Sequence, residues 1–127
     1  MDGVNLFGIP VDDMERAKEF FSKTFGWNFM STGMEGNHHF ATTVPTDENG
    51  LPTEPGGING GLLQRGTYGQ HTPSIFIKVD SIDETIKKVE ENGGKLAFAK
   101  IPIADFAFFA QINDTEGNII SLWEDKV

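Results

Sequence analysis

An internal repeat is the feature of this sequence that most limits its fold. When the chain is shifted by 68 residues, Val11 falls on Val79 within the same pattern of apolar residues. The same shift places Gly26 on Gly94, and each glycine follows a helical pattern. In both halves a strand pattern, a helical pattern, a glycine and three further strand patterns follow in that order. Repeats of this size are supersecondary units that pack together, so the sequence predicts two βαβββ modules.

The length of the chain places both modules in one domain. The 127 residues suffice for one hydrophobic core and are too few for two ordinary domains. We expect a single domain over residues 1–127, with the first module at about 1–68 and the second at about 69–127. Residues 45–57 combine prolines, glycines and acids. This segment is either a plain surface loop or a lid over a pocket.

Capping residues predict where each helix begins. Asp12 with Glu15, and Ser81 with Glu84, have the spacing of a capping box. An apolar stripe at helical spacing follows the first pair and consists of Met14, Ala17, Phe20 and Phe21. A helix with one apolar stripe packs that side against a sheet.

Composition excludes several classes of protein. The net charge of −9 and the absence of a run of basic residues argue against a nucleic-acid partner. No stretch approaches the 18 apolar residues of a membrane span. The start of the sequence lacks the basic and apolar regions of a signal peptide, and the chain has no cysteine. We therefore expect a cytoplasmic protein with no membrane partner.

Alternation along the strand patterns divides the side chains between two faces. Phe7, Ile9 and Val11 are expected to pack on the first helix, and Phe40 and Val44 are assigned to the same side. The predicted ligand-binding residues then lie on the opposite face: Leu6, His39, Ser74, Phe76, Phe109, Ser121 and Trp123. Aromatic rings with a few polar groups are typical of small-molecule sites. The alternative is a second core layer or a subunit contact.

Four segments resemble a known family. They are FGIPVDDMERAKEFFSKTFGW, GGINGGLLQR, KVDSIDETIKKVEENGGK and NDTEGNIISLWE. In type and order they are similar to the vicinal oxygen chelate superfamily, which includes glyoxalase I, bleomycin-resistance proteins and extradiol dioxygenases. The resemblance implies an α+β fold in which two βαβββ modules form a cupped eight-stranded mixed sheet with helices on the outside. It also implies a homodimer that acts on a small molecule.

The metal enzymes of this superfamily carry ligands on the first and last strand of each module. Carried over by position, the resemblance places these ligands at Leu6, Gly61, Ser74 and Ser121. Leucine and glycine provide no ligand atom in the side chain, and neutral serine hydroxyls are poor ligands for a divalent metal. We therefore predict no metal at these positions and no other cofactor.

The three histidines leave an alternative open. His38 and His39 are adjacent, so on a regular strand they point to opposite faces. His39 with His71 could form a displaced metal site, or His39 alone could act as a general acid or base. Ser74 and Ser121 lack the G-x-S-x-G motif of a serine nucleophile.

These observations lead to three hypotheses about function. The first is a metal-independent small-molecule-binding protein of the glyoxalase/bleomycin-resistance type, with its ligand held in the cup of the sheet. The second is a lyase, isomerase or dioxygenase-like enzyme that uses a displaced metal or His39. The third is an interaction domain whose sheet face is buried by a partner.

Overall fold

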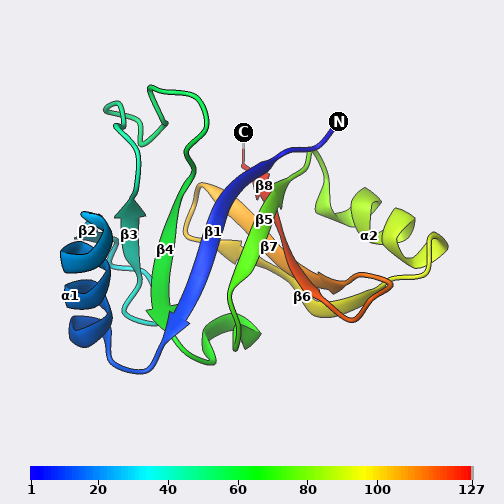
Figure 1. Cartoon of the computed structure of the whole chain (residues 1–127). Coiled ribbons are helices and arrows are strands. Elements are labelled where there is room, and N and C mark those ends of the chain that lie inside the picture. Colours follow the sequence, from blue (N-terminus) through cyan, green and yellow to red (C-terminus); the bar gives the residue numbers. More distant parts are fainter. Residues whose placement is uncertain (127) are drawn as a thin grey trace. The chain divides into compact units, whose positions relative to one another are not determined.

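The computed structural model describes residues 1–126 (Figure 1). The chain divides into two compact units. One unit comprises residues 6–73, and the other combines residues 1–5 with the chain from Ser74 onward. Each unit contains one helix of ten or more residues, α1 with 12 and α2 with 10. Neither of these helices, nor any other in the described part of the chain, is long and apolar enough to cross a membrane.

The first unit holds a strand, a helix and three further strands. Its central strand β4 pairs in parallel with β1 and antiparallel with β3, and β3 pairs antiparallel with β2. The first two residues of β1, Val4 and Asn5, group with the other unit. The elements are β1 (Val4–Val11), α1 (Met14–Phe25), β2 (Asn28–Ser31), β3 (His39–Thr42), β4 (Asn59–Gln64) and a short 3-10 helix (Thr67–Gly69).

The second unit has the same order of elements. Strand β8 pairs in parallel with β5 and antiparallel with β7, and β7 pairs antiparallel with β6. The amide of Lys78 also donates to the carbonyl of Gly3 at 3.0 Å, which holds the N-terminal residues against β5. The elements are β5 (Ser74–Lys78), α2 (Ile82–Glu91), β6 (Lys95–Ile103), β7 (Ala107–Asn113) and β8 (Ile119–Asp125).

The predicted fold class is confirmed. Strand, helix and three strands occur twice in that order, and parallel and antiparallel pairs occur in both halves. A parallel pair requires a long crossover, which in each module includes the helix and the two intervening strands. Over residues 1–126 the protein is therefore an α+β protein with eight strands in two βαβββ modules.

The helix caps agree with the prediction in the second module and differ in the first. Ser81 precedes α2, and its Oγ accepts from the amide of Glu84 at 3.2 Å. Helix α1 is capped by Asp13, whose carboxylate accepts from the amide of Arg16 at 3.0 Å, so the predicted cap at Asp12 is wrong by one residue. Asp12 is an ion-pair partner of Arg65 instead, at 2.8 Å. Both aspartates have the same chemistry, and only the tertiary ion pair distinguishes them.

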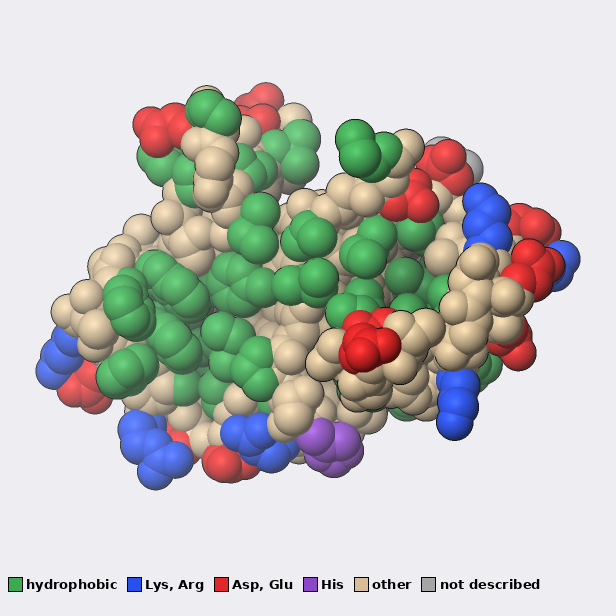
Figure 2. Space-filling model, turned by 45° about the vertical axis from the view of Figure 1, so that its right-hand side comes forward, with side chains coloured by type: hydrophobic (Ala, Val, Ile, Leu, Met, Phe, Trp, Pro, Cys, Tyr) green, Lys and Arg blue, Asp and Glu red, His purple; other side chains and the backbone are tan. Residues whose placement is uncertain are grey.

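The core of the first unit lies between α1 and its sheet. Val11, Met14 and Leu62 are buried there, and Ala17, Phe21, Ile9 and Phe29 pack around them. Phe21 stacks on Trp27 with a centroid distance of 4.8 Å. Phe20, predicted to share the apolar stripe, is 56% exposed at the edge of that stripe. Figure 2 shows that apolar side chains, coloured green, also reach the surface on the face that it draws.

The segment between β3 and β4 contains a local turn that is held by hydrogen bonds. Thr46 forms an isolated antiparallel bridge with Pro52. Inside this bridge the carboxylate of Asp47 accepts from the amides of Asn49 and Leu51, each at 2.9 Å. An aspartate that binds backbone amides a few residues ahead stabilises a local turn.

The core of the second unit depends on residues of β8 and α2. Ile82 and Leu122 are 0% and 2% exposed and pack with Val79, Ala110 and Ile112. The contact of Leu122 with α2 determines which residues lie on each face of β8. Successive side chains alternate, so Ser121 and Trp123 must point away from the helix.

We expect the Leu122→Ala variant to lose about 2–5 kcal/mol of unfolding free energy, because it leaves a cavity beneath α2. Urea unfolding followed by circular dichroism measures this loss. The matched control is Ile75→Ala, since Ile75 lies in the same module and is 41% exposed; it should change the unfolding free energy by less than about 0.5 kcal/mol. Equal losses in the two variants would contradict this account of the core.

Candidate functional site

The face of the second module opposite α2 carries the larger group of predicted site residues. In the strand register Ser121 lies opposite Phe76 and Gln111, and Trp123 lies opposite Phe109. Residues opposite one another point to the same side of a sheet. We call the following set the serine–aromatic face: Ser74, Phe76, Phe109, Gln111, Ser121 and Trp123.

The polar members of this face bind one another in a chain. Ser74 Oγ donates to the carbonyl of Ile75 at 3.1 Å, and the two serine Oγ atoms are 2.9 Å apart. Because the hydrogen of Ser74 is used on Ile75, Ser121 is the donor to Ser74. Gln111 Nε2 donates to Ser121 Oγ at 3.4 Å. Both hydroxyls therefore have their hydrogen bonds within the module, and within residues 1–126 neither is hydrogen-bonded to an imidazole or a carboxylate that could activate it as a nucleophile.

Burial supports a structural role for this polar chain. Ser121, Gln111 and Ser74 are 0%, 2% and 6% exposed. Buried polar groups are stable only when they have hydrogen-bond partners. The chain thus fixes the separation of β5, β7 and β8 on the side that α2 does not cover.

Aromatic rings surround the polar chain within the same module. Phe76 is 5.7 Å from Phe109 and 6.2 Å from Trp123, measured between ring centroids. Phe98 contacts Phe109 at 6.1 Å, and Phe106 contacts Trp123 at 5.9 Å. Phe106 is 46% exposed and Trp123 is half-buried, so the group of rings has a solvent-facing edge. Sequence reasoning missed Phe98 and Phe106, since bulges in β6 interrupt the alternation that would have assigned Phe98 to a face.

Two polar contacts hold the indole of Trp123 in place. Its Nε1 donates to the carboxylate of Asp125 at 2.9 Å, and Lys78 forms an ion pair with the same carboxylate at 2.6 Å. Lys78, and secondly Trp123, lower the pKa of Asp125 below its ordinary value by binding the charged form. Asp125 therefore keeps its negative charge at neutral pH and fixes the indole direction.

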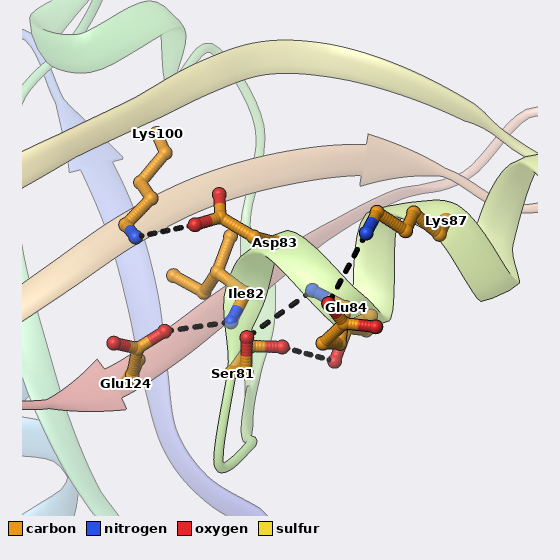
Figure 3. A network of polar contacts seen from close by, with 8 residues as sticks. Ser81, Ile82, Asp83, Glu84, Lys87, Lys100 and Glu124 are labelled. Carbon is orange, nitrogen blue, oxygen red and sulfur yellow. Dashed lines mark hydrogen bonds and ion pairs between the residues drawn. The ribbon is translucent and has the colours of Figure 1, made fainter.

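The opposite side of β8 is bound to the first turn of α2 (Figure 3). Glu124 accepts from the amide of Ile82 at 2.7 Å, where a helix N-terminus has an unpaired donor. Asp83 pairs with Lys100 of β6 at 3.1 Å, and Glu84 pairs with Lys87 at 3.2 Å. The Glu124 contact fixes the position of β8 relative to the start of α2. It thereby also fixes where Ser121 and Trp123, on the other side of β8, lie relative to the helix.

In the first module the structure separates the predicted residues. Leu6 lies opposite Asn59, and Gly61 lies opposite Phe40, which places Leu6, Phe40 and Gly61 on the side away from α1. His39 lies opposite Leu62, a residue that packs on Met14 of α1. The predicted face of His39 is therefore wrong.

The surroundings of His39 agree with its place beside α1. Its Nε2 is 3.3 Å from Asn37 Oδ1. Burial first, and then the charge of Lys18 on α1, lower the pKa of His39, while the charge of Glu15 acts in the opposite direction. The error arose because Phe40 is large and apolar and was assigned to the helix side, whereas strand pairing places it on the other side.

His38 occupies the face where His39 was expected. A Cβ atom built on Gly61 would lie 2.5 Å from His38 Nε2 and 2.9 Å from its Cε1. The imidazole therefore fills the space that any side chain at position 61 would need. His38 Nδ1 is 3.0 Å from Thr32 Oγ1. Sequence reasoning missed His38; its signal was the adjacent His39, since one of two neighbours on a strand must face away from the helix.

The arrangement defines a class of protein before any relative is considered: a duplicated βαβββ protein with one aromatic and polar sheet face and one face carrying an imidazole. A sequence model of the Glyoxalase/Bleomycin resistance protein/Dioxygenase superfamily matches residues 3–122. The chain belongs to this superfamily.

Individual relatives agree with this assignment. A glyoxylase-like domain-containing protein of Didymella fabae is 33% identical over 117 residues, which are 87% of this chain and 84% of that protein. A putative glyoxylase, CFP32, of Mycobacterium bovis is 24% identical over 124 residues, and this chain spans only 44% of its length. Methylmalonyl-CoA epimerase from Mycobacterium tuberculosis has the same fold, with a TM-score of 0.65 at 15% identity over 98% of this chain and 89% of that one.

The side chains at the family's metal-ligand positions do not fit a divalent metal. Leu6 and Gly61 provide no donor atom, and the hydroxyls of Ser74 and Ser121 are bound to each other. Within residues 1–126 no three side chains of histidine, cysteine, aspartate or glutamate gather to hold a metal ion. His39, the proposed ligand of a displaced site, lies beside α1.

We expect Ser121→Ala to reduce the unfolding free energy by about 1–3 kcal/mol, because Gln111 Nε2 and Ser74 Oγ both lose a buried partner. Chemical denaturation measures the loss. Ser31→Ala, at an exposed residue of β2, is the control and should cost less than about 0.5 kcal/mol. A loss at Ser121 no larger than the control would show that the polar chain does not stabilise the module.

The histidines also predict how stability depends on pH. Burial, and secondly the charge of His39, lower the pKa of His38 in the folded protein. Below the ordinary histidine pKa of about 6.5 the unfolded chain binds the proton more readily, so stability falls as pH drops through this range. We expect the loss of unfolding free energy between about pH 7.5 and pH 5 to be smaller in His38→Gln than in the wild type.

Urea titrations at both pH values test this prediction. Removal of the exposed His71, as His71→Gln, is the matched control. His39 also has a lowered pKa, so His38→Gln should abolish only part of the dependence. An unchanged dependence in His38→Gln would show that His38 is not buried as its position over Gly61 requires.

Proposed function

We propose that this protein binds a small molecule without a metal and that the ligand rests on the serine–aromatic face of the second module. One observation carries the proposal: a single sheet face combines aromatic rings in tilted contact with a closed chain of hydroxyl and amide groups. Rings provide apolar contact area, and the few polar groups beneath them are typical of ligand sites. Membership of the superfamily supports the binding of a small molecule.

The polar chain limits what the site does with its ligand. No base among residues 1–126 is hydrogen-bonded to Ser74 or Ser121, so we assign the site binding rather than covalent chemistry. The ligand would first meet Trp123 and Phe106, the rings with exposed surface. The net charge of −9 attracts cations, and ring faces bind them. The expected ligand is therefore a planar or cationic organic molecule.

Two other functions are distinguished by experiment. Acid–base catalysis through His39 is disfavoured by its position beside α1. An interaction domain would bury the aromatic face in a protein partner and leave no small-molecule binding there. The cytoplasmic location and the homodimer belong to this proposal. The location rests on composition and on the resemblance, and the homodimer rests on the resemblance alone.

The two tryptophans allow a direct test of the proposed site. In the Trp27→Phe variant, Trp123 is the one remaining tryptophan, and its fluorescence, excited selectively over that of Tyr68, reports on the serine–aromatic face. We expect titration with a planar organic cation such as berberine, or with bleomycin, to quench this fluorescence with saturation. The matched Trp123→Phe variant retains Trp27, in the first unit, and should show no saturable response.

The same preparation tests metal independence. Elemental analysis of the untagged protein should find much less than one equivalent of Ni, Zn, Fe or Mn per chain. About one equivalent of such a metal per chain, retained after the protein is washed with a chelator, would contradict the metal-free proposal. Absence of a saturable Trp123 response to every probe would contradict ligand binding on this face and favour the interaction domain.

A further inference from the structure

His38 is held by one ring nitrogen and presents the other. Thr32 Oγ1 makes three contacts: with His38 Nδ1 at 3.0 Å, with the carbonyl of His38 at 3.1 Å and with the amide of Met34 at 3.2 Å. The amide of Met34 donates to Oγ1, and the single hydroxyl hydrogen points to the carbonyl. The contact with His38 is then a hydrogen bond only if Nδ1 carries the proton. This is the one arrangement in which all three contacts are hydrogen bonds.

The remaining nitrogen, Nε2, is consequently the one with a free lone pair. It lies 2.5 Å from the Cβ position of Gly61, on the side of β4 that faces away from α1. No hydrogen bond within residues 1–126 is recorded for this atom, and the histidine is only half-buried. His39, by contrast, has its Nε2 against Asn37 and lies beside α1.

Two apolar side chains lie on the same face of the sheet as Nε2. Phe40 lies opposite Gly61 on the neighbouring strand, and Leu6 lies on the same face of the sheet, both half-buried. Glycine at position 61 is required for this geometry, because any larger residue displaces the ring. Burial keeps the imidazole neutral at neutral pH, and the bond to Thr32 orients it, so the lone pair of Nε2 is available to accept a proton or a hydrogen bond.

We propose that His38 gives the first module a proton-accepting site, in which Thr32 holds Nδ1–H and Nε2 accepts a proton or hydrogen bond from a weakly acidic small molecule above Gly61. When Nε2 takes the proton, the ring becomes an imidazolium and the Nδ1 proton keeps its hydrogen bond to Thr32 Oγ1. The ligand then leaves with one more negative charge. The site rests on the proposed function only in that its ligand is a small molecule.

The tautomer is tested by long-range ¹H–¹⁵N correlation spectra of the ¹⁵N-labelled wild type. We expect His38 to be neutral with its proton on Nδ1, and Thr32→Val to lose this preference. In Gly61→Ala the ring must leave its place, so the His38 resonances should shift and its pKa should rise towards about 6.5. Gly3→Ala is the matched control, since a Cβ there meets no atom within 4 Å.

Access to Nε2 is tested with diethyl pyrocarbonate, which acylates a neutral imidazole nitrogen that has a free lone pair. At about pH 6, mass spectrometry of the peptides should find His38 modified and His39 unmodified. The exposed His71 serves as the internal standard for the reagent.

Each contrary outcome overturns a defined part of the proposal. A proton on Nε2, or Gly61→Ala spectra with an unchanged His38, would show that the ring is not held as inferred. Modification of His71 without His38 would show that small molecules do not reach Nε2. These measurements need no ligand on the second module, so a failed Trp123 titration with a reactive His38 would contradict the proposed function alone.

Discussion

Parallel pairing of the first and last strand within each module is the constraint on which the site residues depend. It joins β1 to β4 and β5 to β8 across the whole length of the module. Ser74 and Ser121, 47 residues apart in sequence, come within 2.9 Å because of it. The helix makes this pairing possible, since a parallel connection needs a long crossover, and it buries one face of the paired strands. The other face is left for polar and aromatic groups.

The two modules use the same backbone position in different ways. Ser121 lies opposite Gln111, and Gly61 lies opposite Phe40, each on the strand that pairs in parallel with the start of its module. The serine can bond to its neighbours, so the second module closes its polar groups upon one another. The glycine has no side chain to offer, and the free volume is taken by His38 from the adjacent strand connection. The absence of a side chain at Gly61 therefore makes room for the imidazole of His38, which can accept or donate a proton.

Sequence patterns predicted the second module better than the first. Leu122 and Val79 alternate with polar or aromatic neighbours, and burial of the aliphatic side beneath α2 then determines the face of Ser121 and Trp123. In the first module β4 contains Gly60 and Gly61 and has no alternation from which a face could be assigned. The order of elements was predictable throughout, because it depends on the repeat and the glycine stops rather than on any single face.

The error at His39 has a geometric cause that the repeat concealed. Pairing places Met30 opposite Phe40, ten residues further on, in the first hairpin and Phe98 opposite Gln111, 13 residues further on, in the second, so the second hairpin is longer. A constant shift along the sequence therefore cannot align both β2 with β6 and β3 with β7. With Gly61 equivalent to Ser121, strand pairing makes Phe40, not His39 or Thr43, the counterpart of Gln111. When the length of a hairpin differs between two repeats, the return strand can present its opposite face. Only the cross-strand partners then show which of the two histidines lies on the side away from α1.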